Sequence, residues 1–272
     1  MRPTGHPTAS ESSSAEVAAP KAPGKARRRR ASRLFRFDRS LGSRYVAGAD
    51  EAGRGSLAGP LVAAGVLIDH STLSRRDRVA LGLLNDSKQM SIEEREHLLP
   101  VVLRAASRVA VEVRCVSGID SRGLHNTNIA ALARCLERVW MDGATCLSDG
   151  FRLPGCTVEH RAVVNGDATS AAIAAASVIA KVTRDRFMRR AAARYPSWDF
   201  AGNVGYSTPE HRDAIRRFGI SALHRRSFNS IAYSQLELAG SERVADVLVI
   251  EEPAAAVEEH PDDVEAKRAD AA

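Results

Sequence analysis

The stretch that decides the fold, residues 44–60, reads Arg44-Tyr-Val-Ala-Gly-Ala-Asp50-Glu-Ala-Gly-Arg-Gly-Ser-Leu-Ala-Gly-Pro60. Its apolar first part predicts a strand that ends at two adjacent carboxylates, Asp50 and Glu51, before a loop rich in glycine. Neighbouring strand residues point to opposite faces, so both acids can serve one site only if the pleat breaks there, which the glycines permit. Adjacent carboxylates repel each other unless a cation lies between them. The stretch therefore predicts a metal site, with an exposed turn as the alternative.

Strand and helix patterns alternate downstream of this stretch. Apolar or alternating runs predict strands at residues 61–68, 109–116, 144–147 and 158–164. A capping box at Ser91–Glu94 predicts a helix to about Ala106, and further helices are predicted at residues 128–141, 169–195 and from Pro209 to Gly219. This order predicts an α/β fold in which helices flank a mixed β-sheet, followed by a C-terminal helical segment.

The charged residues are distributed unevenly along the chain. The formal net charge is +6, but residues 1–40 hold ten basic and three acidic residues, and residues 241–272 hold three basic and ten acidic ones. Because the two ends cancel, the middle is itself basic, which favours an anionic partner such as nucleic acid. Composition predicts disordered tails at residues 1–40 and 237–272 around one folded domain at residues 41–236. The run Arg27–Arg30 could contact phosphates, although a solvated basic tail is the simpler interpretation.

Several features indicate a soluble protein of a reducing compartment. The four cysteines form no C-x-x-C pair and lie in apolar surroundings, which predicts reduced, packed thiols. The N-terminus lacks the apolar core of a signal peptide. The longest run of small apolar residues, 171–180, is too short to span a bilayer, which needs ~20 residues. We therefore expect a cytoplasmic protein without a membrane segment. We also expect a monomer, although the sequence does not settle the oligomeric state.

Two further acids follow predicted strands. Asp149 comes after the strand at residues 144–147, and Asp167 lies between a strand and the long helix. Each alone would fit a cap or a turn, but with Asp50 and Glu51 they form a carboxylate cluster that has no matching His or Cys ligands. Sites built from oxygen alone suit Mg²⁺ or Mn²⁺, and two such ions can activate water for phosphodiester hydrolysis.

No protein nucleophile competes with this interpretation. Ser177 lies among alanines of the long helix, and no Ser-His-Asp or Cys-His arrangement stands out. Asp185 is 18 residues beyond Asp167, about 27 Å along a straight helix, so the two cannot share a metal. We expect Asp185 to form a structural ion pair instead.

Over about residues 42–230 the motifs resemble those of the ribonuclease HII family. The resemblance is carried by Gly48-Ala-Asp50-Glu51-Ala-Gly53-Arg54-Gly55-Ser-Leu-Ala-Gly59-Pro60, Asn85-Asp86-Ser87-Lys88-Gln89-Met90-Ser91, Asp149-Gly150, Gly166-Asp167, residues 174–185, Gly205-Tyr206-Ser-Thr-Pro-Glu-His211 and His224-Arg225-Arg226-Ser227-Phe228. It implies an RNase H-like fold and an endoribonuclease that cuts the RNA strand of RNA–DNA hybrids by two-metal hydrolysis, leaving 5′-phosphate and 3′-hydroxyl ends. It also implies cutting at a single ribonucleotide embedded in duplex DNA, and so a part in removing ribonucleotides from DNA.

The resemblance also implies roles for individual residues. Asp50, Glu51, Asp149 and Asp167 would be the metal ligands, holding Mn²⁺ or Mg²⁺. The loop Gly53-Arg54-Gly55 would read the ribose 2′-hydroxyl, largely through backbone groups, and Tyr206 would stack on the neighbouring deoxyribose. These roles agree with the chemistry, because the 2′-hydroxyl is the local difference between RNA and DNA.

Three basic residues complete the expected substrate site. We interpret Lys88, Lys181 and Arg184 as phosphate contacts, with solvated surface charges as the alternative. Asn165 stands where the family usually has lysine before Gly-Asp, which removes one positive charge beside the site.

Two alternative functions stay open at this point. The chain could be another RNase H-like nuclease, such as ribonuclease HIII or a resolvase, although residues 1–40 cannot form the extra N-terminal domain of ribonuclease HIII. It could also be an inactive hybrid-binding protein, although such a protein would gain from losing clustered carboxylates near phosphates.

Overall fold

The structure, a computed structural model, describes residues 25–81, 84 and 90–228, and for residues 25–32 it describes the backbone only. Its five-stranded sheet has the order β3-β2-β1-β4-β5. β1 pairs antiparallel with β2, as β2 does with β3, whereas the β1–β4 and β4–β5 pairs are parallel. The strands are β1 (Tyr45–Ala52), β2 (Leu61–Asp69), β3 (Arg108–Arg114), β4 (Ala144–Asp149) and β5 (His160–Val163). The mixed sheet is thus confirmed.

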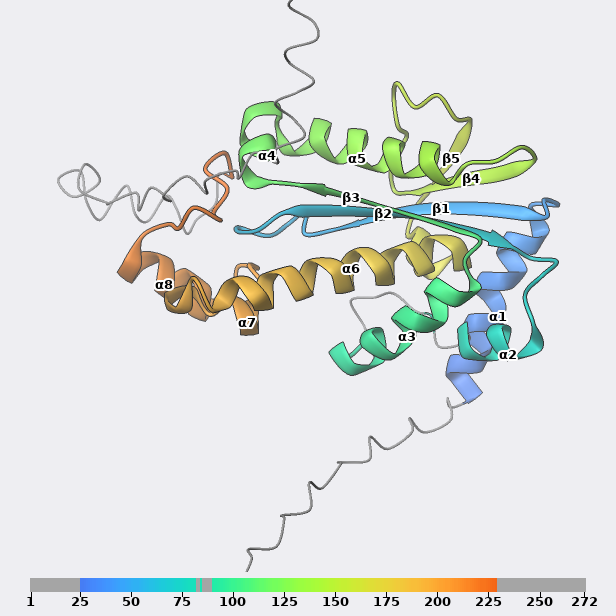
Figure 1. The fold of residues 1–272 in the computed structure, drawn as a ribbon, viewed down its shortest axis with the longest axis horizontal. Helices are drawn as coiled ribbons and strands as arrows, with labels where there is room; N and C mark the ends of the chain where they lie inside the picture. The colour runs from blue at the N-terminus through green and yellow to red at the C-terminus, as the bar shows by residue number, and fades with distance from the viewer. Residues whose placement is uncertain (1–24, 82–83, 85–89, 229–272) are drawn as a thin grey trace, which may run out of the picture.

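Helices cover both faces of this sheet (Figure 1). Figure 1 shows α4 and α5 on one face, and α6 on the other with α1, α2 and α3 on its side. The helices are α1 (Lys25–Ser40), α2 (Arg75–Ala80), α3 (Ile92–Ala105), α4 (Val116–Arg122), α5 (Leu124–Val139), α6 (Ala171–Ala192), α7 (Phe200–Asn203) and α8 (Pro209–Phe218), with short 3₁₀ turns η3 (Gly166–Ala168) and η4 (Pro196–Trp198). None of the described helices is long and apolar enough to cross a membrane.

The predicted helix starts are confirmed by their caps. The Ser91 hydroxyl accepts the N–H of Glu94, and the Glu94 carboxylate accepts the N–H of Ser91, which is the predicted capping box. α8 begins at Pro209 after the N-cap Thr208 and ends before Gly219. The predicted C-terminal helical segment therefore exists, as α7 and α8.

Glycines in the two central strands let both helix layers approach the sheet closely. A Cβ atom on Gly48 would lie 2.4 Å from backbone atoms of Ala172 and Ile173 in α6, and one on Gly65 would lie 2.7 Å from the backbone of Cys135 in α5. Because backbone cannot move aside as a flexible side chain can, both positions exclude larger residues. The small residues of α6 serve the same close packing from the helix side, since Ala171 to Ala176 are all buried.

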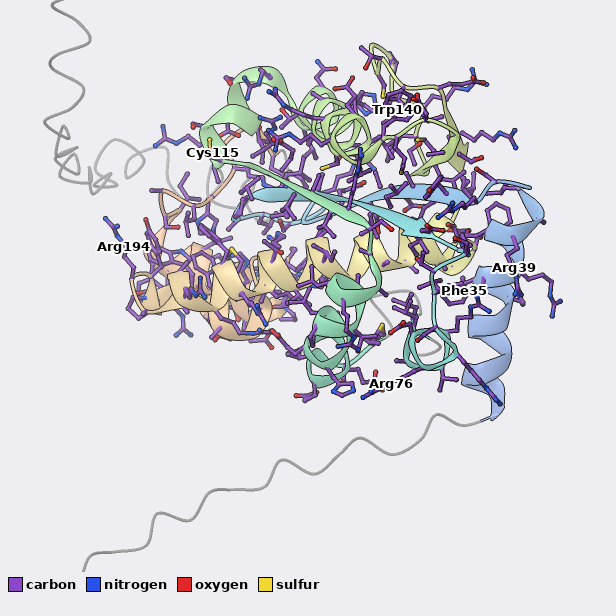
Figure 2. The ribbon with its side chains drawn as sticks, turned by 45° about the vertical axis from the view of Figure 1, so that its right-hand side comes forward. Phe35, Arg39, Arg76, Cys115, Trp140 and Arg194 are labelled. Atoms are coloured by element: carbon purple, nitrogen blue, oxygen red, sulfur yellow. The ribbon has the colours of Figure 1, made fainter. Side chains whose placement is uncertain are left out.

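The prediction of disorder over residues 1–40 is wrong for residues 25–40, which form α1. Leu34 and Phe35 are buried in the core that α6 shares with the sheet. In Figure 2 Phe35 points toward the body of the molecule, whereas Arg39 points outward. The apolar stretch of α1 is short and follows a run of basic residues, so local periodicity does not predict a helix. Packing against α6 stabilises it instead. Residues 1–24 and 229–272 lie outside the described residues, including the acidic tail predicted at 237–272.

The prediction of packed, reduced thiols is correct in part. All four cysteines are free, and Cys135 and Cys146 are buried, but Cys115 is exposed.

A buried carboxylate attaches α1 to the start of α6. Asp38 is fully buried, and its Oδ2 accepts the backbone N–H of Ala172 at 3.1 Å, so it caps the first turn of α6 together with the N-cap Ser170. His70 Nε2 lies 3.7 Å from the same oxygen. Burial raises the pKa of the Asp38 carboxyl to about 6, against the hydrogen bonds that favour the ionised form.

We expect Asp38→Asn to become more stable relative to the wild type as the pH rises. The folded-state pKa of about 6 lies above the ordinary value of 3.8, so the wild type loses stability as the pH rises from 3.8 through 6. Asparagine keeps an oxygen that can cap α6 and does not ionise. The free energy of unfolding is measured for both proteins by urea unfolding at pH 4 and at pH 7.5. Between the two pH values, the free energy of Asp38→Asn relative to the wild type should rise by about 2–3 kcal/mol. A pH-independent difference would contradict the raised pKa.

Candidate active site

Parallel pairing brings the first and third acidic positions to the same end of neighbouring strands. The ladder between β1 and β4 pairs Ala47 with Cys146 and ends at Ala49 and Ser148. Asp50 and Asp149 are the next residues on these strands, so both carboxylates leave the sheet at the same edge. The predicted convergence of these two acids is therefore confirmed.

Asp50 is the most buried of the four acids, with 5% of its surface exposed. It lies on the α6 side of the sheet, where it accepts a hydrogen bond from the Ser177 hydroxyl, and its Oδ1 accepts the N–H of Glu51 at 2.7 Å. Burial raises the pKa of Asp50 well above its usual range, and the negative charges of Glu51 and Asp149 raise it further. The protein therefore holds Asp50 where a carboxylate alone is unfavourable.

Glu51 leaves the strand on the opposite side. β1 continues through Glu51, which pairs with Ala63, to Ala52, so the predicted break in the pleat is wrong. Alternation places Glu51 on the same face as Ala47 and Ala49, which pack toward α5. Its charge still acts on Asp50, so the two carboxylates flank one strand end from two sides.

A hydrogen bond joins Asp149 to the turn that carries Asp167. The Gly166 N–H donates to Asp149 Oδ1 at 2.6 Å, and Asp167 follows it in η3 with 7% of its surface exposed. Asn165 enters this turn at φ 51°, a left-handed conformation that asparagine adopts more readily than most residues. Asparagine at residue 165 thus suits the backbone of this turn, which Asp167 follows.

The chemistry of the four acids fits divalent cations that prefer oxygen. Within the described ranges, no three acidic, histidine or cysteine side chains converge closely enough to enclose one ion. The acids instead line one edge of the sheet, and the like charges around Asp50 would be relieved by a cation beside them. Carboxylate oxygens without nitrogen or sulfur donors favour Mg²⁺ or Mn²⁺ over Zn²⁺.

Arg184 lies beneath the glycine loop and is not a phosphate contact, so that prediction is wrong. Its side chain is fully buried, and it donates to the carbonyl oxygens of Pro60, Ala58 and Val204 and to the Ser56 hydroxyl, at 2.7–3.0 Å. Gly53 has φ +87°, and a Cβ there would lie 1.9 Å from Arg184 Nε. A guanidinium carries enough donors in a fixed plane to bind several carbonyl groups at once, which fixes the shape of the loop.

A second buried arginine, which sequence reasoning missed, holds the same loop. Arg225 donates to the carbonyl oxygen of Gly59 through Nε and a terminal nitrogen, and to that of Arg54, at 2.9–3.1 Å. Its motif was recognised, but nothing in a sequence distinguishes an arginine that binds backbone carbonyls from one that faces phosphate. Together the two arginines bind the carbonyl groups of Arg54, Ala58, Gly59 and Pro60, and so fix the loop that contains Gly53 and Gly55.

Tyr206 lies beside this loop against two cations. Lys181 Nζ and Arg184 Cζ are each 5.1 Å from the centre of the Tyr206 ring. Lys181 is also 2.7 Å from Asp185 Oδ1, and Arg95 lies 3.5 Å from Asp185 Oδ2, which confirms the structural ion pair predicted for Asp185. Arg54 is exposed and lies over the Phe151 ring at 4.6 Å. Lys88 falls outside the described residues.

Two buried histidines form a chain of hydrogen bonds to the backbone of Tyr206, and the contacts determine which nitrogen of each ring carries the proton. The Ser221 N–H donates to His224 Nδ1 at 2.9 Å, so the remaining proton of neutral His224 is on Nε2. That nitrogen lies 3.1 Å from His211 Nε2, and His211 Nδ1 lies 2.8 Å from the Tyr206 carbonyl oxygen. His224 therefore donates to His211, which donates to Tyr206. Burial lowers the pKa of both rings, to about 3 for His224, and keeps them neutral.

Comparison with known proteins gives a consistent result. The family model described as Ribonuclease HII matches residues 47–231. The chain is 42% identical over 198 residues to Ribonuclease HII of Geobacillus kaustophilus, covering 72% of this chain and 73% of the relative. It is 38% identical over 201 residues to Ribonuclease HII of Clostridium beijerinckii, covering 74% and 73%.

Solved structures show the same architecture. The ribonuclease H2 of Pyrococcus horikoshii OT3 is similar with a TM-score of 0.60 and 27% identity, over 72% of this chain and 98% of that one. RNase HII of Archaeoglobus fulgidus, from its complex with PCNA, has a TM-score of 0.57 and 27% identity, over 68% and 95%. The RNase H-like fold predicted from the motifs is thereby confirmed.

We expect Asp50→Asn to stabilise the protein in the absence of divalent ions. Asparagine keeps the size and the Ser177 contact while it removes a charge that burial and two carboxylates disfavour, for a gain of about 1–2 kcal/mol. Urea unfolding in EDTA at pH 8 measures this gain. Asp69→Asn is the matched control, because Arg44 pairs with Asp69 and lowers its pKa, so that change should destabilise. A loss of stability in Asp50→Asn would contradict charge repulsion at this site.

Proposed function

Because the chain belongs to the ribonuclease HII family and is therefore a ribonuclease H, we propose that it also cuts on the 5′ side of single ribonucleotides in duplex DNA. This activity would remove ribonucleotides from DNA and leave 5′-phosphate and 3′-hydroxyl ends. The observation that carries the proposal is the edge of the sheet where Asp50, Glu51 and Asp149 lie together, with Asp50 buried among like charges. Such an arrangement is unfavourable for folding and suits divalent-metal chemistry.

The four acids have related roles in this proposal. Asp50, Glu51, Asp149 and Asp167 would hold two divalent ions, Mg²⁺ or Mn²⁺. The ions, when bound, supply Lewis acidity, which activates a water molecule and stabilises the leaving oxygen. Asp50 and Asp149 are preorganised by Ser177 and by the Gly166 N–H, so their oxygens need little rearrangement on binding.

The loop at Gly53–Gly55 and the ring of Tyr206 would select the substrate. A Cβ on Gly55 would meet nothing within 4 Å, so a sugar could approach the backbone there, and the arginines hold the carbonyl groups of Pro60 and Arg54, which would fix the loop for contact with a 2′-hydroxyl. Tyr206 would lie against the sugar that follows the ribonucleotide, where an aromatic face favours a deoxyribose over a ribose with its extra hydroxyl. The pair would read a junction of one ribonucleotide followed by DNA.

Positive charge near the site would bind the phosphates of the substrate. Arg54 is exposed at the loop, Lys181 is close to Tyr206, and Lys88 is proposed for this role from its motif. Lys181 forms an ion pair with Asp185, so it would contribute less to phosphate binding than an unpaired ammonium group. We further propose that the protein acts as a monomer in the cytoplasm.

We expect the protein to cut a DNA duplex carrying one ribonucleotide, with Mg²⁺ or Mn²⁺ but not in EDTA, and to leave an all-DNA duplex intact. Asp149→Asn should lower the rate by about 10³-fold or more while binding of the duplex is retained, since it removes one metal ligand. Product ends and rates are measured on labelled duplexes. Turnover retained by Asp149→Asn would reject its assignment, and cleavage of long hybrids alone would reject the single-ribonucleotide activity.

Tyr206→Ala should reduce cutting at a single ribonucleotide on the order of tenfold more than cutting of a long RNA–DNA hybrid. In a long hybrid the following sugar is also a ribose, so the proposed contact contributes little there. Tyr206→Phe is the control, because it keeps the ring between Lys181 and Arg184 and should retain the preference. Equal losses on both substrates would argue against a junction-reading role.

A further inference from the structure

A pocket between α1 and the start of α6 borders the acidic site. It has a volume of about 300 Å³ and is lined by Arg33, Arg36, Phe37, Ser40, Ala168 and Thr169. Ala168 and Thr169 directly follow Asp167, so one wall of the pocket is the continuation of the segment that carries an active-site acid. Among the described residues, the lining contains two guanidinium groups and no carboxylate.

Docking of α1 decides which of its residues face this pocket. Leu34, Phe35 and Asp38 are buried, and Asp38 is used in capping α6. Arg33 and Arg36 are exposed and three residues apart, so they lie on one face of the helix about 5–6 Å from each other. A helix fixed by its buried face therefore presents two neighbouring arginines beside the site at little cost in backbone entropy.

Contacts along α6 give the order of the pocket, the acids and Tyr206. Ala172 contacts Asp38 of α1, Ser177 contacts Asp50, and Lys181 and Arg184 flank Tyr206. Figure 1 shows the same order, with α1 at one end of α6 and with α7 and α8 at the other. Asp50 thus lies between the pocket and Tyr206. The 12 residues from Ala172 to Arg184 correspond to about 18 Å of helix, or roughly five base-pair steps of a duplex.

We propose that Arg33 and Arg36 bind the phosphate backbone of the substrate duplex on the side of the cut opposite to Tyr206. The direction rests on the proposed function: with Tyr206 against the sugar that follows the ribonucleotide, the pocket faces the duplex on the 5′ side. A guanidinium group can donate two parallel hydrogen bonds to the oxygens of one phosphate. Arg33 and Arg36 are suited to such binding, because they are exposed and no carboxylate is among the described residues that line the pocket. The basic helix therefore extends the substrate footprint beyond the residues that recognise the ribonucleotide.

The test is binding of Arg33→Gln/Arg36→Gln to a duplex with one ribonucleotide and 12 base pairs on each side, measured by fluorescence anisotropy in EDTA. We expect about tenfold weaker binding at low salt and a slope of log Kd against log salt that is smaller by 1 to 2, in line with the loss of one or two phosphate contacts. Glutamine favours helix, so α1 should form, and urea unfolding checks this. Arg33→Lys/Arg36→Lys, which keeps the charge, should recover most of the slope.

The matched control is Arg75→Gln/Arg76→Gln, which removes the same charge from exposed positions on α2. Arg76 lies at the lower edge of the view in Figure 2. This variant should bind as the wild type does. If it loses as much affinity as the α1 variant, the effect is one of net charge and the pocket is not a site.

Shortening the duplex tests the side on which the pocket acts. With no base pair on the 5′ side of the ribonucleotide, the wild type and the α1 variant should bind equally, whereas shortening the 3′ side should leave their difference intact. A difference that survives 5′ shortening overturns the proposal. Binding to an all-DNA duplex tests the role of Arg33 and Arg36 independently of the proposed function. Weaker binding of the all-DNA duplex by the α1 variant supports this role even if no ribonucleotide is cut. Unchanged binding rejects it even if cutting occurs.

Discussion

The backbone of α6 lies directly on β1 at Gly48, and the positions of the site residues depend on this contact. A Cβ at Gly48 would meet the backbone of α6 at 2.4 Å, so only glycine allows the approach. The same packing puts Ser177 beside Asp50 and sets the first turn of α6 against Asp38 of α1. The single helix α6 therefore contacts three regions along its length: α1, the edge of the sheet that carries Asp50 and Asp149, and Tyr206.

The acidic edge is maintained against its own repulsion. Parallel pairing of β1 and β4 forces Asp50 and Asp149 to the same end of the sheet, and strand alternation puts Glu51 on the other side of the same strand end. Burial then raises the pKa of Asp50 well above its usual range. Sites that function through bound ions commonly retain such unfavourable charge, because the surrounding core supplies the stability that the site removes.

Buried polar groups hold the glycine loop and Tyr206, the two features that we propose to contact the substrate. Arg184 and Arg225 bind the carbonyl groups of the glycine loop from beneath, and His211 and His224 hold the backbone of Tyr206. Each of these groups is buried with partners that satisfy it, so the loop and the ring have little freedom. This rigidity supports the role that we propose for the loop, because a misplaced donor could not bind a single hydroxyl group.

The sequence by itself determined the mixed α/β fold, the principal strands and helices, and the convergence of Asp50 and Asp149. Strand patterns, helix caps and the order of the motifs depend on residues that are close together in the sequence, so they can be recognised without the structure. It did not determine that residues 25–40 form a helix, that the pleat continues through Glu51, or that Arg184 lies beneath the loop. Only the tertiary structure decided these features. The docking of α1 depends on a distant helix end, and an arginine is an internal anchor or a phosphate contact according to which carbonyl groups surround it, which the chain reveals only when it is folded.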